Sequence, residues 1–154
     1  VASRQVFDLN LQQAMKRRQR DGSPVSIIMM DIDRFKAIND TYGHLNGDLA
    51  LQETARIMQS IMRDSDTLCR WGGDEFIVIA QNCNIHDATI IAEKSRDAIE
   101  KITLMTLPDK IQVSVSAGVT EVQDSDSMDD AIARADAALY HAKEGGRNRV
   151  HAIT

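Results

Sequence analysis

Apolar residues recur every three or four positions in five segments of the chain, which is the spacing of helices with one buried face. We expect Gly43 to end the second helix and the third to open near Gly47 and Asp48. Ser127 is expected to cap the last helix. The five helices are predicted at residues 7–20, 35–42, about 47–62, 88–102 and 127–142.

Strand-like segments lie between these helices. Residues 25–31 are apolar on both faces, which is typical of a strand buried between two layers. Two further strands flank Gly72-Gly73-Asp74-Glu75, so this segment is predicted to be the turn of a β-hairpin. The predicted strands cover residues 25–31, 67–71, 76–80, 111–119 and 149–153.

The order of these elements predicts the fold class. It runs helix, strand, two helices, hairpin, helix, strand, helix, strand, which indicates an α/β (α+β) sandwich rather than a doubly wound parallel fold. A mixed central β-sheet would be flanked by helices, with the hairpin inserted. The 154 residues contain no repeat or linker, so residues 1–154 are expected to form a single domain.

Composition narrows the classes of function. A net charge of −5 argues against a general nucleic-acid binder, although a bound metal ion would still allow a small anionic ligand. No apolar run is long enough to cross a bilayer, so no direct membrane contact is expected. Cys69 and Cys83 have no metal-ligand spacing, which favours reduced thiols and a cytoplasmic location. The start at Val1 suggests a domain excised from a longer protein.

Two acidic spots are the main candidates for chemistry. Asp31-Ile32-Asp33 ends the buried strand, and Asp74-Glu75 lies in the hairpin turn. If they converge, they would form an oxygen-rich site suited to Mg²⁺. The alternative is that each spot is an ordinary solvated turn. Gly72 and Gly73 would allow positive φ or a close approach to a ligand, or they are simply turn residues.

Polar residues between the first strand and the third helix suggest recognition of a base. Asn39 and Asp48 carry the donors and acceptors that the edge of guanine requires, and His44 lies between them in the sequence. The alternative is that Asn39 and Asp48 are helix caps. The basic residues Lys36, Lys143 and Arg147 would bind phosphates only if they face the acidic site; Lys143 also suits a helix C-terminus by itself.

These residues form a set of linked motifs in one order. Gly72-Gly73-Asp74-Glu75-Phe76 follows D-I-D-R-F-K at 31–36 and N-D-T-Y-G-H-L-N-G-D at 39–48. A-L-Y-H-A-K at 138–143 precedes G-R-N at 146–148. The set resembles the GGDEF-domain diguanylate cyclase family from about Ser3 onward. That resemblance implies a ferredoxin-like core similar to nucleotidyl cyclases and polymerase palms, and synthesis of cyclic di-GMP from two GTP.

The resemblance also implies roles for single residues. Asp31, the carbonyl of Ile32, and Asp74 would bind Mg²⁺ or Mn²⁺, with Asp74 and Glu75 catalytic and Asp33 supporting. Asn39, His44 and Asp48 would contact the nucleotide, and Gly72 and Gly73 would lie against the substrate. The residues implied to hold phosphates are Phe35, Lys36, Lys143 and Arg147.

Regulation and partners are implied in the same way. Arg63 and Asp66 match the family's R-x-x-D inhibitory site for the product, with a solvated salt pair as the alternative. The expected partners are GTP, cyclic di-GMP, a second copy in a transient homodimer and an upstream sensory domain. The competing interpretation is a catalytically silent module that binds GTP or cyclic di-GMP.

Overall fold

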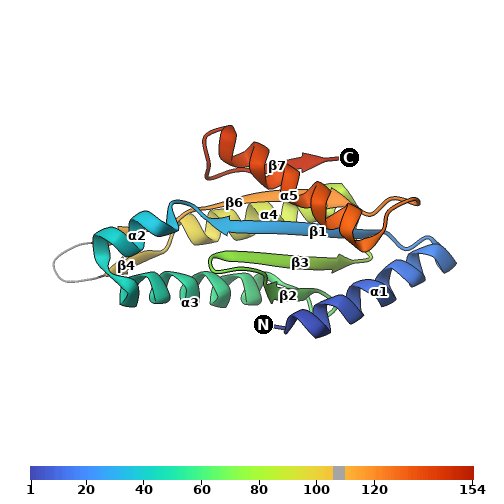
Figure 1. The fold of residues 1–154 in the computed structure, drawn as a ribbon, viewed down its shortest axis with the longest axis horizontal. Coiled ribbons are helices and arrows are strands. Elements are labelled where there is room, and N and C mark those ends of the chain that lie inside the picture. The colour runs from blue at the N-terminus through green and yellow to red at the C-terminus, as the bar shows by residue number, and fades with distance from the viewer. Residues whose placement is uncertain (106–109) are drawn as a thin grey trace.

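The chain folds into three layers, a central sheet with helices on both faces (Figure 1). The computed structural model describes residues 1–105 and 110–154. The helices are α1 (Arg4–Asp21), α2 (Phe35–Tyr42), α3 (His44–Ile61), α4 (Ile85–Glu100) and α5 (Met128–Glu144). The strands are β1 (Val25–Ile32), β2 (Thr67–Arg70), β3 (Glu75–Gln81), β4 (Thr103–Met105), β5 (Lys110–Gln112), β6 (Val115–Glu121) and β7 (Val150–Ile153).

The main sheet has the order β2-β3-β1-β6-β7. The β6 and β7 strands pair parallel and the other neighbours pair antiparallel, so the predicted mixed sheet is confirmed. The β2 and β3 strands form the predicted hairpin, and β3 pairs with the central β1. The hairpin turn therefore lies beside the end of β1.

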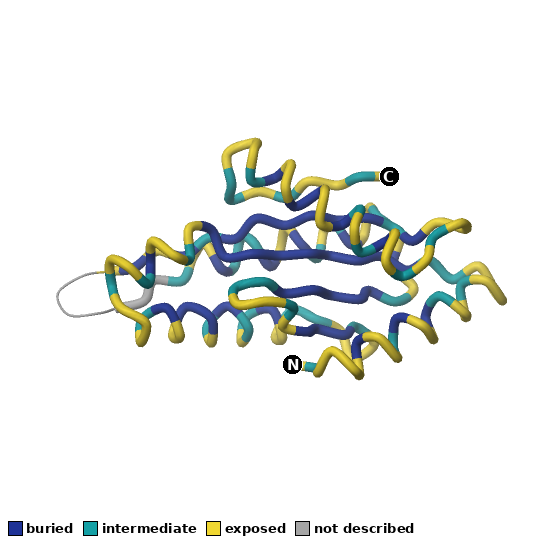
Figure 2. Tube along the Cα trace, viewed as in Figure 1, coloured by how far each residue is buried: buried dark blue, intermediate teal, exposed yellow. Residues whose placement is uncertain are grey.

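The β1 strand is buried along its whole length, as its apolar sequence predicts (Figure 2). Val25, Ile27 and Met29 pack in one cluster with side chains from α1 and α5. The alternate residues, such as Ile28 and Met30, pack in a second cluster with α2, α3 and α4. Because successive side chains of a strand point to opposite faces, Asp31 follows Met29 onto the side of α5.

Two predicted element boundaries are wrong. The α3 helix begins at His44, directly after Gly43, whose φ of 89° ends α2, rather than near Gly47 and Asp48. The single strand predicted over residues 111–119 is two strands in different sheets, because β5 pairs with β4. The break comes at Ser114, whose carbonyl accepts a hydrogen bond from the Asp33 N–H (2.9 Å).

The start of α5 follows its sequence closely. Ser127 accepts a hydrogen bond from the backbone N–H of Asp130, and the Asp130 carboxylate accepts one from the N–H of Ser127. This reciprocal cap fixes the beginning of the helix that later carries Lys143. Among the described residues, no helix is both long and apolar enough to cross a bilayer.

Candidate active site

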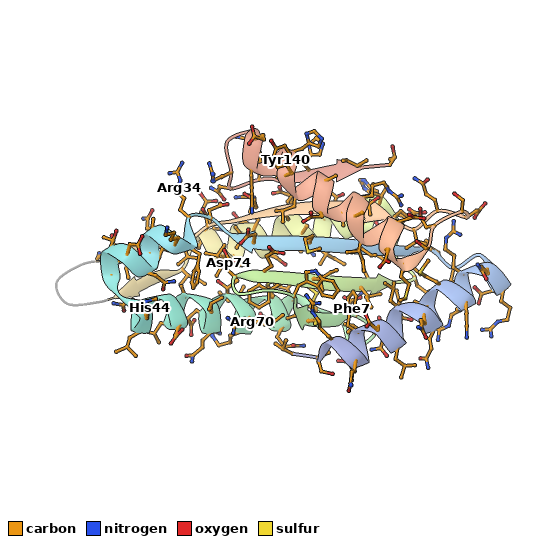
Figure 3. All side chains as sticks on the ribbon, in the orientation of Figure 1. Phe7, Arg34, His44, Arg70, Asp74 and Tyr140 are labelled. Carbon is orange, nitrogen blue, oxygen red and sulfur yellow. The ribbon has the colours of Figure 1, made fainter. Side chains whose placement is uncertain are left out.

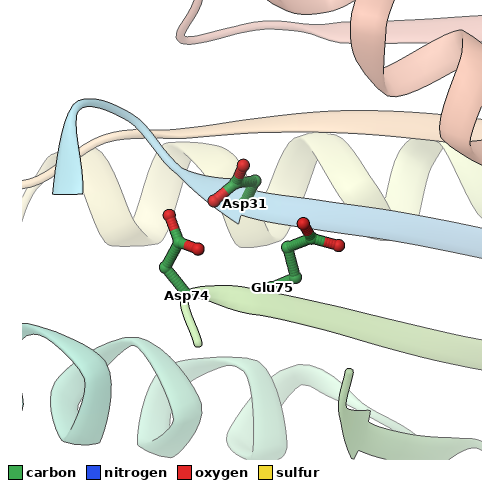
Figure 4. Close-up of side chains that lie close together, drawn as sticks. All are labelled: Asp31, Asp74 and Glu75. Carbon is green, nitrogen blue, oxygen red and sulfur yellow. The ribbon is translucent and has the colours of Figure 1, made fainter. Parts of the chain in front are cut away.

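Three carboxylates from two distant segments meet at the end of β1 (Figure 4). Asp31 lies directly across from Glu75 in the antiparallel register of β1 and β3. The N–H of Ile32 donates to the carbonyl of Asp74 (3.2 Å), which fixes the hairpin turn against β1. One oxygen from each of Asp31, Asp74 and Glu75 lies within 4.8 Å of the others. We call these three residues the acidic cluster.

The environment of Asp31 is poor for a lone carboxylate. The side chain is buried, and its Oδ1 has no hydrogen-bond partner among the described residues. Burial and the neighbouring Asp74 carboxyl raise the pKa of Asp31 to about 7, although the hydrogen bond from Lys143 to Oδ2 opposes this rise. Burial lowers the pKa of Lys143, but its contact with Asp31 outweighs that effect and the pKa is raised. Lys143 therefore pairs with only one oxygen of Asp31, and a further positive charge would stabilise the acidic cluster.

A cavity of about 210 Å³ opens beside the acidic cluster. The cavity brings together residues that were predicted to contact a metal or phosphate. They come from the end of β1, the start of α2, the hairpin and the end of α5. Arg34 is a further lining residue that the sequence analysis did not identify. The lining residues are Asp31, Ile32, Asp33, Arg34, Phe35, Lys36, Asp74, Lys143 and Arg147.

Asp33 has a different environment from Asp31. Its two oxygens accept hydrogen bonds from Ser114 Oγ (2.7 Å), Ser116 Oγ (2.6 Å) and the backbone N–H of Asn148 (3.0 Å). The last bond holds the segment in which Arg147 has φ of 64°. Asp33 therefore anchors the segment that carries Arg147, a lining residue of the cavity, and the supporting role expected for Asp33 stays a prediction.

The hairpin turn is held from outside by residues that the sequence analysis did not assign. Arg70 donates from its guanidinium to the carbonyl of Gly73 (2.5 Å). Arg4, at the start of α1, donates to the carbonyl of Trp71 (2.5 Å), and its guanidinium lies 3.9 Å from the centre of the Trp71 ring. These contacts fix the residues that precede Asp74, and no local pattern in the sequence links Arg4 to Trp71.

The two turn glycines are not required by the backbone. Neither Gly72 nor Gly73 has a positive φ, so the prediction that the turn needs glycine for that conformation is wrong. A Cβ at Gly73 would meet nothing within 4 Å, and one at Gly72 would make only ordinary contacts with Glu75. Space on the outer side of the turn is therefore open to a ligand.

The residues predicted to read a base are spread along α2 and α3. Asn39 lies within α2 against Gly47, where an added Cβ would fall 1.8 Å from Asn39 Oδ1. Asp48 lines a separate cavity of about 360 Å³ together with Arg70. Asn39 and Asp48 are not helix caps, so that alternative is wrong. The N-cap positions of α2 and α3 are occupied by Arg34 and Gly43.

His44 does not line the cavity beside the acidic cluster. It is exposed at the start of α3, and Figure 3 shows it well away from Asp74. The structure therefore brings the predicted metal and phosphate residues together, and leaves His44 apart from them.

Arg63 and Asp66 form an ion pair in the turn between α3 and β2. The guanidinium of Arg63 donates to both carboxylate oxygens of Asp66, at 3.2 and 2.8 Å, and to the carbonyl of Gln81 (2.9 Å). The Asp66 side chain is 0% exposed, whereas that of Arg63 is 44% exposed. The structure therefore contains the ion pair, with Asp66 buried rather than solvated, and the inhibitory role stays a prediction.

Comparisons with known proteins agree on one family. The family model for "Diguanylate cyclase, GGDEF domain" matches residues 1–149. Diguanylate cyclase A of Treponema denticola is 46% identical over 127 residues, which are 82% of this chain and 34% of that protein. Diguanylate cyclase VdcA of Vibrio cholerae is 46% identical over 132 residues, 84% of this chain and 39% of that protein. The chain spans between a third and two fifths of these relatives.

Solved structures are similar over nearly the whole chain. The diguanylate cyclase SiaD in complex with its activator SiaC from Pseudomonas aeruginosa has a TM-score of 0.94 at 35% identity, covering 99% of this chain and 59% of that chain. The coiled coil and GGDEF domain of DgcB from Caulobacter crescentus, in complex with c-di-GMP, has a TM-score of 0.93 at 31% identity, covering 99% and 82%. The expected fold class is thereby confirmed.

Proposed function

The chain belongs to the diguanylate cyclase GGDEF-domain family, and from this premise we propose that it condenses two GTP molecules into cyclic di-GMP and two pyrophosphates. The observation that carries the proposal is the acidic cluster beside a cavity lined by Lys36, Lys143 and Arg147. This juxtaposition supports the proposal because it would let one place hold both a divalent cation and a triphosphate.

The donor set of the acidic cluster fits Mg²⁺ or Mn²⁺. Both are hard cations that prefer oxygen ligands, and the cluster offers three carboxylates. The buried Oδ1 of Asp31 has no partner among the described residues, so a cation would remove an existing electrostatic cost. Asp31, Asp74 and the carbonyl of Ile32 would hold the ion. When bound, it would polarise phosphate oxygens and lower the pKa of the attacking hydroxyl.

In each of two steps the 3′-hydroxyl oxygen of one GTP attacks the α-phosphorus of the other, and the bond to pyrophosphate breaks. Lys36, Lys143 and Arg147 would bind the β- and γ-phosphates and stabilise the negative charge that accumulates on the leaving group. Glu75 and Asp74 would orient the attacking hydroxyl and accept its proton.

Asn39 and Asp48 would select guanine. An amide and a carboxylate together accept hydrogen bonds from guanine N1–H and its exocyclic amine, whereas adenine lacks this pair of donors. The base would lie in the cavity at Asp48, which is separate from the cavity beside the acidic cluster. Replacing Asp48 with Ala should raise the KM for GTP while ATP remains a poor substrate.

The product has two-fold symmetry, so we propose that synthesis takes place in a transient homodimer. Each domain would bind one GTP and present its 3′-hydroxyl to the partner's α-phosphate. An upstream sensory domain in a longer protein, located in the cytoplasm where GTP is available, would control this encounter. The rate per protomer should therefore rise with protein concentration.

We propose that Arg63 and Asp66 also bind the product as an inhibitory site. The guanidinium of Arg63 uses Nε and one terminal nitrogen for its bonds to Asp66 and Gln81, and the Cys83 side chain is a further neighbour. Because 44% of the Arg63 side chain is exposed, its outer face would fork onto a phosphate or onto guanine. Binding need not break the existing pair with Asp66.

Incubation with GTP and Mg²⁺, followed by chromatographic identification of the nucleotide product, tests the function. We expect cyclic di-GMP from the unchanged chain and from Asp136→Ala, which alters an exposed carboxylate on α5. Roughly 100-fold less product, or even less, is expected from Asp74→Asn. Binding of GTP by the unchanged chain with no product at any protein concentration would instead favour a silent binding module.

A further inference from the structure

Two imidazole rings lie close together outside the acidic cluster. His141 is in the last turn of α5 and His151 is in β7, and their ring centres are 5.1 Å apart with an angle of 37° between the planes. Both residues are exposed. The Tyr140 ring packs edge-on against His141 at 6.1 Å, and Figure 3 shows Tyr140 on the outer side of α5, away from Asp74.

The spacing of the two rings matches shared coordination of one ion. A Zn–N bond of about 2.0–2.1 Å places each ring centre about 3.2 Å from the metal, since the coordinating nitrogen lies about 1.1 Å from the ring centre. At the tetrahedral angle of about 109°, two such centres are about 5.2 Å apart. The observed separation of 5.1 Å is close to this value, and shared coordination requires that one nitrogen of each exposed ring turn toward the ion.

The donor chemistry separates this pair from the acidic cluster. Neutral imidazole nitrogen is the commonest ligand for Zn²⁺, Ni²⁺ and Cu²⁺, whereas Mg²⁺ prefers oxygen. The three-carboxylate cluster contains neither histidine. The histidine pair should therefore bind transition metals in preference to Mg²⁺, whereas excess Mg²⁺ should occupy the acidic cluster.

We propose that His141 and His151 form a second cation site, which binds Zn²⁺ or another imidazole-preferring transition metal and completes its coordination with water. The ion would join the last turn of α5 to β7. Between these two anchors the chain makes the tight loop that carries Arg147 and Asn148, both with positive φ. A bound ion would thus close the base of the loop that directs Arg147 to the cavity.

Calorimetric titration of the whole chain with Zn²⁺, in the presence of excess Mg²⁺ and without nucleotide, tests the proposal. We expect one site in the unchanged chain, and affinity at least about tenfold weaker in either His141→Ala or His151→Ala, because one ligand is then lost. His86→Ala removes an exposed histidine elsewhere and should bind like the unchanged chain. Thermal unfolding should move to higher temperature with Zn²⁺ only where both histidines remain.

The site does not depend on the proposed enzymatic function. Asp74→Asn should keep Zn²⁺ binding while it loses cyclic di-GMP synthesis, so failure of one proposal would leave the other intact. Equal Zn²⁺ affinity in the unchanged chain and His151→Ala, or loss of binding in His86→Ala alone, would overturn the site.

Discussion

Asp31 and Asp33 lie two residues apart at the end of β1, but their hydrogen-bonding surroundings differ. Asp33 has hydrogen bonds from Ser114, Ser116 and the N–H of Asn148. Asp31 contacts Lys143 through one oxygen only, and its other oxygen is buried without a partner among the described residues. Each side chain is a carboxylate with little exposed surface, so burial alone does not separate them.

The difference lies in whether the protein itself provides the donors. A buried carboxylate whose donors are all present stabilises the fold, and its loss should be measured mainly as lost stability. A carboxylate crowded by Asp74 and Glu75, with one oxygen unpaired, costs stability unless another group supplies positive charge. Asp33 is therefore interpreted as a structural anchor and the acidic cluster as the site of chemistry.

The largest expected effect comes from the acidic cluster itself. Asp74→Asn removes one negative charge and one oxygen ligand, so synthesis of cyclic di-GMP should fall by roughly 100-fold or more. The free energy of unfolding should rise by about 1 kcal/mol, because repulsion with Asp31 is relieved. Initial rates and denaturant unfolding of the same preparation measure both. An active or a strongly destabilised Asp74→Asn would show that the acidic cluster is not the site of chemistry.

The opposite balance is expected at Asp33. Asp33→Ala leaves the Asn148 N–H without its acceptor and should lower the free energy of unfolding by about 3 kcal/mol. Activity should fall by only about tenfold under conditions where the variant is folded, through misplacement of Arg147. Urea unfolding beside rates at low temperature provides the measurement. A stable variant with no activity would mean that Asp33 takes part in the chemistry directly.

The same distinction between fold and site applies to two glycines. A Cβ at Gly118 would lie 2.2 Å from the backbone nitrogen of Leu139, whereas one at Gly73 would meet nothing. Gly118→Ala should therefore cost about 2 kcal/mol or more of stability. Gly73→Ala should unfold like the unchanged chain but bind GTP several-fold more weakly. Equal GTP affinity in Gly73→Ala would show that the turn does not approach the substrate.

A pH series sharpens the contrast further. The pKa of Asp31 is raised from 3.8 to about 7. Between these two pH values the folded chain therefore holds a proton on Asp31 that the unfolded chain releases. The contribution of Asp31 to stability should thus be complete below about pH 4 and decline as the pH rises through about 7. Affinity for Mg²⁺ should increase over the same rise. Thermal unfolding with a chelator, compared with Asp31→Asn, isolates this contribution, and identical pH profiles would contradict it.

The smallest effect is expected at Arg63. Arg63→Ala should raise the concentration of cyclic di-GMP needed for half inhibition by about tenfold while the initial rate is unchanged. Arg56→Ala is a matched control, because Arg56 pairs with Glu53 at the same i,i+3 distance along the chain. Both are followed by rates at increasing product concentration. Inhibition of Arg63→Ala at the original concentration would remove the inhibitory assignment.

The fold could largely be predicted from local pattern. The apolar run of β1 predicts a strand buried on both sides, and Ser127 predicts the start of α5. The division between β5 and β6 could not be predicted, because it depends on Ser114 bonding to Asp33, which is 81 positions away. Alternation of polar and apolar residues continues through that break and gives no signal for it.

The candidate site was predictable in its membership but not in its geometry. Linked motifs point to Asp31, Asp74 and Lys143, yet periodicity along the chain does not place an α5 lysine against a β1 carboxylate. That contact forms because the Asp31 side chain points to one face of the sheet and α5 packs on the same face. Arg4 and Trp71 show the same limitation, since their contact exists only after α1 packs beside the hairpin.

Mn²⁺ binding, measured by electron paramagnetic resonance in the presence of a non-hydrolysable GTP analogue, tests most directly whether the acidic cluster holds a divalent cation. We predict tight binding by the unchanged chain and by Asp136→Ala, and loss of that binding in Asp31→Asn and Asp74→Asn. Unaltered Mn²⁺ affinity in both cluster variants, with the fold intact, would contradict the account.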